Sequence, residues 1–394
     1  MTINSKTLAV TPETAGYLPE RIKALDEFYI SLIEKGELQG AIYGLSRNGC
    51  AFAERALGRR RHDDPEQGTL RHDSIRRIAS ITKLFTAVAI LKLNEDGALN
   101  VAHPVCEYLK EFDGGPFRDI NLAHLLTHTS GISGDDGALP ALYRHSWYDM
   151  CCFNESTHDH WVKAAIAGPP RAKPGEIWSY SSIGYAMLGE IVTRITGIKY
   201  EDWVMDNITA PLGLSDTYFD VPRTKWDRVV AVDDWSDPFK REELAASRKD
   251  ENARSNRREL DIPSAGGGLF STVGDLLTFG NTLLHNGLCV NTGKRILSKK
   301  SVDMLRTDCG YESKNFCWGL KGVKKYYGHG ADLYGYNRQG LNSRGTYGHE
   351  GAGFCGLYID PDEGFVAAFF VPNTVGWHSI AVENGSNIIW SGLA

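Results

Sequence analysis

The sequence has neither an excess of positive charge nor a long apolar run. Its 43 Lys and Arg residues are fewer than its 49 Asp and Glu residues, so the formal net charge is −6. Such a chain lacks the basic surface that attracts phosphate backbones or anionic lipids. No stretch approaches the roughly 20 apolar residues of a membrane span. We therefore expect a small molecule as its partner, and neither nucleic acid nor a membrane.

The first 20 residues contain no charged start that is followed by a continuous apolar stretch and a small-residue cleavage site. Those three features together mark a secretory signal. The sequence therefore predicts a cytoplasmic protein.

Cysteine and histidine are present without a clear metal-binding pattern. The cysteines fall at positions 50, 106, 151, 152, 289, 309, 317 and 355. None of these spacings is the paired spacing of a zinc site. His158 and His160 could share a metal ion, but no third ligand accompanies them, and surface residues explain them better. We expect thiols without disulfides, no metal site and no cofactor.

Several familiar motifs fail on inspection. The stretch Gly44–Asn48 lacks the final glycine of the α/β-hydrolase nucleophile elbow. His349-Glu350 is not followed by the second histidine of a zinc protease, and Gly287–Lys294 has the wrong spacing for a phosphate-binding loop. The chemistry must therefore lie elsewhere in the chain.

The chain is long enough, at 394 residues with 42% hydrophobic content, for one large domain or two intimate ones. Apolar periodicity predicts helices at 20–36, from about residue 80 to 93, at 183–195 and near 273–286. Alternation predicts strands within 40–58, around an Asn48-Gly49 turn, and within 345–373. The densely charged stretch 240–260 predicts a solvated loop or a surface helix.

Strands near both chain ends with helices between them predict an α/β (α+β) fold. We expect a mostly antiparallel sheet of about five or more strands, with flanking helices and a large helical insert. Residues 1–79 and 271–394 would form the α/β domain, and residues 80–270 a mostly helical domain. The active site would lie between them.

Ser80-Ile81-Thr82-Lys83 is the only Ser-x-x-Lys in the chain. If Ser80 opens a helix, Lys83 lies on the same face one turn later. A lysine on this oily helix is desolvated, which disfavours its charged form and makes it a candidate base. An N-cap serine and a lysine that snorkels to solvent explain the four residues better when they are taken alone.

Two further stretches carry polar groups in unusual surroundings. Tyr180 precedes the helix at 183–195 and could project its phenol into a cleft, although an isolated tyrosine is more often half buried with a satisfied hydroxyl. His349 lies in the glycine-rich strand YGHEGAGFCG, where a substrate or another backbone can approach closely. Tight packing of a central strand is the equally weighted alternative.

In this order the three motifs resemble the family of class C β-lactamases, D-alanyl-D-alanine carboxypeptidases and their esterase relatives. Other stretches that resemble this family are LLTHTSGIS, PGEIWSYSSIGYAMLGEIV and SAGGGLFSTVGDLLTFG. The resemblance covers roughly residues 20 to 394.

The resemblance implies a role for each matching residue. Ser80 would form an acyl-enzyme, Lys83 would help to deprotonate it, and Tyr180 would pass a proton to the leaving group and later activate water. Ser182 and His349 would contact the substrate. The amides of Ser80 and Ala352, the residue after Gly351, would form the oxyanion hole.

Two departures from the family pattern bear on the substrate. Ser182 stands where the family has asparagine, and His349 where true β-lactamases have lysine. Losing both favours an esterase or amidase with a less charged substrate, and a β-lactamase or D-amino-acid peptidase is the alternative. A non-catalytic binding or scaffold protein is the rival from another class, although a scaffold needs none of Ser80, Lys83 and Tyr180.

Overall fold

The computed structural model describes residues 3–63, 68–132, 134–135, 161–234, 236–247, 262–317, 321–338, 340–373 and 379–394. Cys151, Cys152, His158 and His160 lie outside these residues, as does most of the charged stretch 240–260.

A six-stranded sheet is built from both ends of the chain, with the strand order β1-β3-β2-β10-β9-β8. Every neighbouring pair is antiparallel. The strands are β1 (Ile3–Ser5), β2 (Gly40–Arg47), β3 (Cys50–Gly58), β8 (Tyr347–Gly351), β9 (Cys355–Asp360) and β10 (Phe365–Phe370). The predicted α/β fold, with its sheet drawn from both termini, is confirmed.

The predicted hairpin turn joins β2 to β3. Asn48 and Gly49 have φ angles of 51° and 86°, and positive φ at both central residues is what a tight type I′ turn requires. On its other edge, β2 pairs along its length with β10, from Ile42↔Phe370 to Arg47↔Phe365. This pairing joins the N-terminal strands to the C-terminal ones.

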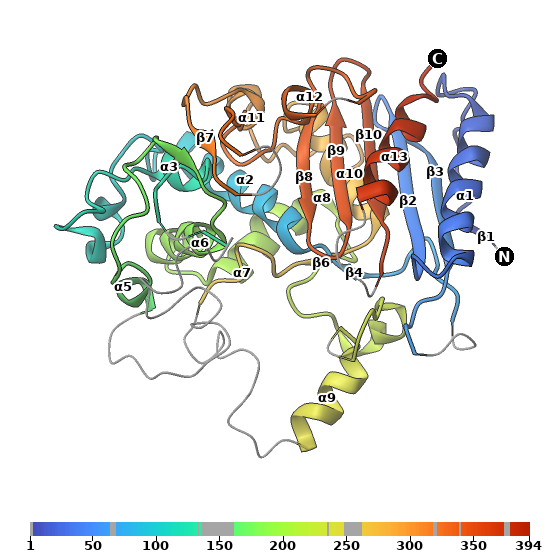
Figure 1. Cartoon of the computed structure of the whole chain (residues 1–394), viewed down its shortest axis with the longest axis horizontal. Helices are drawn as coiled ribbons and strands as arrows, with labels where there is room; N and C mark the ends of the chain where they lie inside the picture. Colours follow the sequence, from blue (N-terminus) through green and yellow to red (C-terminus); the bar gives the residue numbers. More distant parts are fainter. Residues whose placement is uncertain are drawn as a thin grey trace.

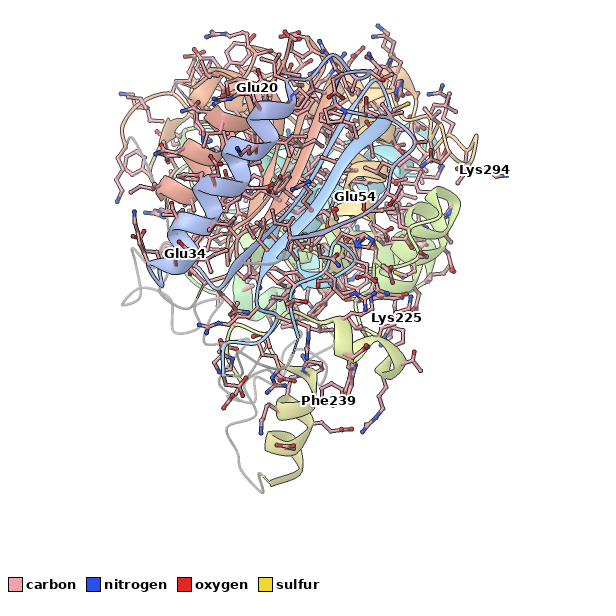
Figure 2. All side chains as sticks on the ribbon, turned by 90° about the vertical axis from the view of Figure 1, so that its right-hand side faces the viewer. Glu20, Glu34, Glu54, Lys225, Phe239 and Lys294 are labelled. Atoms are coloured by element: carbon pink, nitrogen blue, oxygen red, sulfur yellow. The ribbon has the colours of Figure 1, made fainter. Side chains whose placement is uncertain are left out.

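Helices cover both faces of the sheet (Figure 1). On one face lie α1 (Pro19–Glu34) and α13 (Ser379–Trp390), and on the other lies α10 (Val273–Leu284). Figure 2 shows α1 in front of the sheet and roughly along its strands, with Glu20 and Glu34 toward the two ends of the helix and Glu54 on β3 to its right. Because both faces are covered, β9 and β10 are buried at every position.

Most of the remaining helices lie in the sequence between β3 and α10, and two follow α10. They are α2 (Thr82–Glu95), α3 (Leu122–Leu126), α5 (Trp161–Ala165), α6 (Ser182–Thr196), α7 (Tyr200–Val204), α8 (Ala210–Leu212), α9 (Pro238–Ser247), α11 (Lys299–Arg306) and α12 (Tyr334–Asn337). Short 3₁₀ turns are η1 (Ala79–Ile81), η2 (Val105–Glu107), η3 (Lys110–Phe112) and η5 (Arg223–Arg228), and η4 (Met205–Thr209) is a π-helical turn. None of the helices in the described ranges is long and apolar enough to cross a bilayer.

The α2 helix occupies the centre of the molecule, between the sheet and the helices α3 and α6 (Figure 1). Its residues from Thr82 to Leu91 are all buried, as its nearly uniform apolar sequence predicts. Ser80 does not open this helix: it lies in η1, and α2 begins at Thr82. The 3₁₀ turn tightens the entry to the helix.

Two short strand pairs tie the inserted region to the rest of the chain. β4 (Arg76–Arg77) pairs antiparallel with β6 (Phe270–Ser271), and β5 (Ile177–Trp178) pairs parallel with β7 (Lys314–Asn315). The strand β4 of the first pair ends just before Ile78, the residue that precedes η1. The strand β5 of the second pair ends two residues before Tyr180. The sequence showed no sign of either pair because two-residue strands have no periodicity.

The charged stretch begins as a helix. α9 projects from the body of the molecule in Figure 1, and the Phe239 ring near its start lies 5.3 Å from the Trp226 ring. The prediction of a loop or surface helix for 240–260 is met by a helix as far as Ser247, where the described residues of this stretch end.

Candidate active site

Ser80 lies where the sheet meets the helical part of the molecule. Its 3₁₀ turn is closed by a hydrogen bond from the Ile81 amide to the Ile78 carbonyl, and the Ile78 amide donates to the Leu269 carbonyl at 2.9 Å. Ala79, immediately before the serine, has a φ of 43°, a conformation that costs energy in a non-glycine residue. The fold therefore holds Ser80 on a strained turn, and hydrogen bonds to the backbone on either side keep the turn in place.

Lys83 is completely buried one turn later. Its Nζ lies 3.3 Å from Ser80 Oγ, 3.1 Å from Ser182 Oγ and 2.6 Å from the Gly266 carbonyl oxygen. It also lies 4.6 Å from the centre of the Tyr180 ring. A buried amine needs such partners, and this one reaches its neighbours inside the protein, without snorkelling to solvent.

Tyr180 reaches the same point from the segment before α6. Its amide donates to Cys317 Sγ at 3.0 Å, and Ser181 caps α6 by accepting from the Gly184 amide at 3.2 Å. Burial raises the pKa of the Tyr180 hydroxyl well above 10, the negative charge of Asp135 raises it further, and a hydrogen bond with Ser80 opposes the shift. Tyr180 is therefore a neutral phenol at pH 7, able to donate a proton.

The His128 ring packs against the Tyr180 ring. The ring centres of the two residues are 4.3 Å apart, and His128 Nδ1 accepts from the Ser181 amide at 3.0 Å. Burial and the charge of Lys83 lower the pKa of His128 well below 6.5, so its ring is neutral. His128 thus fixes both the position of the tyrosine ring and the backbone of the next residue.

His349 presents a neutral imidazole from β8. Its Nδ1 lies 2.5 Å from its neighbour's carbonyl oxygen, that of Glu350, and this nitrogen must therefore carry the hydrogen. Nε2 is left as a buried acceptor without a partner among the described residues. Burial and Lys83 lower the pKa of His349 to about 4. The ring lies 6.1 Å from that of Tyr180.

The end of β8 packs directly on the turn that carries Ser80. A Cβ atom on Gly351 would lie 2.3 Å from the Ile78 carbonyl oxygen, so only glycine fits this approach. The next residue, Ala352, is exposed. This contact places the turn that carries Ser80 beside the residue that follows Gly351, the two backbone segments whose amides the family resemblance assigns to the oxyanion hole.

Ser182 contacts other protein groups at the site. Besides Lys83, its hydroxyl contacts Asp135, to which it donates at 2.5 Å, and its amide donates to the other carboxylate oxygen at 2.7 Å. The Asp135 amide in turn donates to the Tyr180 carbonyl at 2.8 Å. Ser182 and Asp135 therefore form one connected unit beside Lys83.

Sequence reasoning missed His128, Asp135 and Gly266. His128 lies in LLTHTSGIS and Gly266 in SAGGG, two stretches that resembled the family without suggesting a role for any residue in them. Asp135 follows the first stretch in a loop, and no local pattern distinguishes it from other surface acids. His62, Asp63 and Asp234 are the only described His, Cys, Asp and Glu side chains that are grouped closely enough to share a metal ion. Asp63 already pairs with Arg61 there, so we assign no metal.

Known proteins resemble this chain in sequence and in fold. The Beta-lactamase family profile matches residues 23–386. Penicillin-binding protein 4 from Amycolatopsis lactamdurans is 28% identical over 301 residues, which cover 75% of this chain and 71% of that protein. An uncharacterized protein from Mycobacterium tuberculosis is 29% identical over 254 residues, 61% of this chain and 60% of its own. The match to penicillin-binding protein 4* of Bacillus subtilis, at 28% identity, spans 50% of this chain and 41% of the relative. The chain thus matches well under two thirds of the length of some of these relatives.

Two solved structures share the whole fold. A penicillin-binding protein homolog from Caulobacter crescentus superposes with a TM-score of 0.72 at 17% identity, and a family VIII carboxylesterase with a TM-score of 0.70 at 18% identity. Each alignment covers 100% of both chains. At these identities the likeness concerns the fold alone.

Proposed function

This chain belongs to the β-lactamase family, and from that premise we propose that it is a serine hydrolase that cleaves carboxylic esters through an acyl-enzyme on Ser80. The observation that carries the proposal is the contact of the fully buried Lys83 with Ser80, 3.3 Å between Nζ and Oγ, beside the neutral phenol of Tyr180. A nucleophile within reach of a base and of a proton donor is the arrangement that acyl transfer needs.

In the acylation step, Ser80 Oγ attacks the ester carbonyl carbon, and its proton passes to the amine form of Lys83. The leaving alcohol takes a proton from the Tyr180 hydroxyl as the ester C–O bond breaks. Proton transfer from the Lys83 ammonium to the Tyr180 phenolate restores both groups. The Ser80 and Ala352 amides would stabilise the oxyanion, which is typically worth a few kcal/mol. Water then cleaves the acyl-enzyme by the same route in reverse.

His349 argues for an uncharged substrate. With a pKa near 4 it carries no charge at neutral pH, and Nε2 can only accept a hydrogen bond. A lysine at this position could bind a substrate carboxylate, whereas a neutral acceptor cannot. We therefore favour short-chain esters over penicillins, cephalosporins and peptides that end in a carboxylate.

Hydrolysis of p-nitrophenyl acetate and butyrate tests the proposal against its alternatives. We expect measurable kcat/KM on both esters, loss of turnover in Ser80→Ala, and a lower kcat/KM on nitrocefin than on p-nitrophenyl butyrate. Equal or faster nitrocefin hydrolysis would restore the β-lactamase alternative. Hydrolysis at the background rate by both wild type and Ser80→Ala, on the esters and on nitrocefin alike, would favour a non-catalytic binding protein.

A further inference from the structure

Asp135 approaches the proposed catalytic cluster from a loop that the sequence did not single out. Its two carboxylate oxygens accept the amide and the hydroxyl of Ser182, at 2.7 and 2.5 Å. Ser182 Oγ lies 3.1 Å from Lys83 Nζ. An unbroken chain of hydrogen bonds therefore runs from Asp135 through Ser182 and Lys83 to Ser80.

The carboxylate decides the direction of the hydrogen bonds in this chain. A hydroxyl has one hydrogen, and Ser182 gives its hydrogen to Asp135. Toward Lys83, Ser182 can therefore only accept. The Gly266 carbonyl, 2.6 Å from Nζ, is also an acceptor by nature. Two of the N–H bonds of Lys83 are thus directed to Ser182 and Gly266.

The third direction from Nζ points to Ser80. When Lys83 is a neutral amine, it has two N–H bonds and one lone pair, and two acceptors already take the N–H bonds. The lone pair is then left for the Ser80 hydroxyl, 3.3 Å away. We propose that Asp135 is a positioning residue that orients the Ser182 hydroxyl, so that neutral Lys83 directs its lone pair at the nucleophile.

This inference rests on the proposed function and adds a requirement to it. Ser182 takes the place of the family's usual asparagine, whose amide can donate and accept at once. A serine has a single hydrogen, and without an external acceptor it could donate that hydrogen to the Lys83 lone pair and block the base. Asp135 removes this competing arrangement.

Asp135→Asn is the direct test because it keeps the side-chain shape. Its amide can present N–H groups to Ser182, which frees the serine hydrogen to face Lys83. We expect kcat on p-nitrophenyl butyrate to fall by about 10-fold or more, since a misdirected base loses part of its contribution. The acidic limb of the kcat profile should move down by roughly half to one pH unit, because a negative charge near the lysine is lost. An unchanged kcat and an unmoved limb would overturn the inference.

A double-mutant cycle separates orientation from simple loop anchoring. If Asp135 acts through the Ser182 hydroxyl, Asp135→Asn should have little further effect in a Ser182→Ala background. If Asp135 only anchors the loop, through its bonds to the Ser182 amide and the Tyr180 carbonyl, the two losses should multiply, and the inference fails. Asp96→Asn is the matched control, because Asp96 is an exposed acid at the far end of α2.

The rate of Ser80 labelling by a fluorophosphonate provides a readout that does not depend on the substrate. This reagent forms a phosphorus–oxygen bond to Ser80 as fluoride leaves and the serine proton passes to the base. Slower labelling of Asp135→Asn than of wild type at pH 7, with equal labelling of Asp96→Asn, supports the inference. Equal labelling of all three refutes it. If wild type itself is neither labelled nor active on esters, the proposed function is what fails.

Discussion

Lys83 is the residue at which packing and chemistry make opposite demands. Burying an amine in an apolar helix opposes stability unless every hydrogen finds an acceptor. Among the described residues, Lys83 Nζ lies within hydrogen-bond distance of Ser80, Ser182 and Gly266. These groups can accept the hydrogens of an ammonium, and two of them suffice for the neutral amine that the proposed mechanism requires.

Lys83→Met separates the two roles because methionine has similar length and no charge. We expect a melting temperature near that of wild type or higher, since a desolvated polar group is removed. Turnover of p-nitrophenyl butyrate should fall by about 10²-fold or more, in kcat as well as kcat/KM. Thermal unfolding and steady-state kinetics on the same preparation measure both effects. Near-normal kcat in this variant would refute the mechanism even if Ser80 proved to be the nucleophile.

Tyr180→Phe extends the same argument to the proton donor. It removes only the hydroxyl and leaves the ring packed on His128. We expect a loss of kcat similar to that of Lys83→Met. The double variant should lose far less than the product of the two, because groups of one proton relay are not additive. Fully multiplicative losses would place the two residues in separate steps.

At the scale of single elements, β8 and η1 approach each other so closely that no side chain fits between them at Gly351. The Gly351 position lies against the Ile78 carbonyl, and Cys355 Sγ donates to the same oxygen at 3.2 Å. The strand and the turn must stay in this contact if the amides of Ser80 and Ala352 are to face one substrate oxygen.

Gly351→Ala should therefore damage catalysis through geometry. The new Cβ would lie 2.3 Å from the Ile78 carbonyl oxygen and 2.6 Å from Cys355 Sγ, so β8 must move away from η1. We expect kcat to fall by about 10²-fold, the typical effect of a lost oxyanion donor, with a lowered melting temperature. Gly184→Ala is the control, since its Cβ would meet atoms at 3.6 to 3.8 Å, and it should stay active. Wild-type kcat in a folded Gly351→Ala would exclude β8 from the oxyanion site.

At the scale of the whole molecule, neutral histidines are buried where the sheet meets the helical part. The pKa of His349 is lowered to about 4 and that of His128 well below 6.5, chiefly by burial. Between the lowered pKa values of the folded state and the ordinary histidine pKa of about 6.5, the unfolded chain binds more protons than the folded one. The stability that these neutral histidines allow is therefore fully present above about pH 6.5. It decreases as the pH falls toward 4.

His349→Gln should weaken this acid sensitivity. Between pH 7.5 and pH 5, the free energy of unfolding of wild type should decrease by about 1–2 kcal/mol more than that of the variant, as the His349 shift implies. Urea unfolding at both pH values measures the difference. If His349→Gln retained the wild-type pH dependence, His349 would not be a neutral buried group.

The sequence alone determined the features that depend on local spacing. Alternation and the Asn48-Gly49 turn predicted the hairpin, apolar periodicity predicted α1, α6 and α10, and the Ser80–Lys83 spacing placed two polar groups one turn apart. The order of the motifs at Ser80, Tyr180 and His349, together with three further stretches, indicated the family.

Only the tertiary structure decided what surrounds Lys83. Its partners Ser182 and Gly266 are 99 and 183 residues away in sequence, and Asp135 reaches Ser182 from a separate loop. Two further features could not be predicted from the sequence. One is the strand pair β5–β7 before Tyr180, and the other is the hydrogen bond that sets the His349 tautomer. Such contacts follow from how whole elements pack, and packing leaves no periodic trace in the segments that it joins.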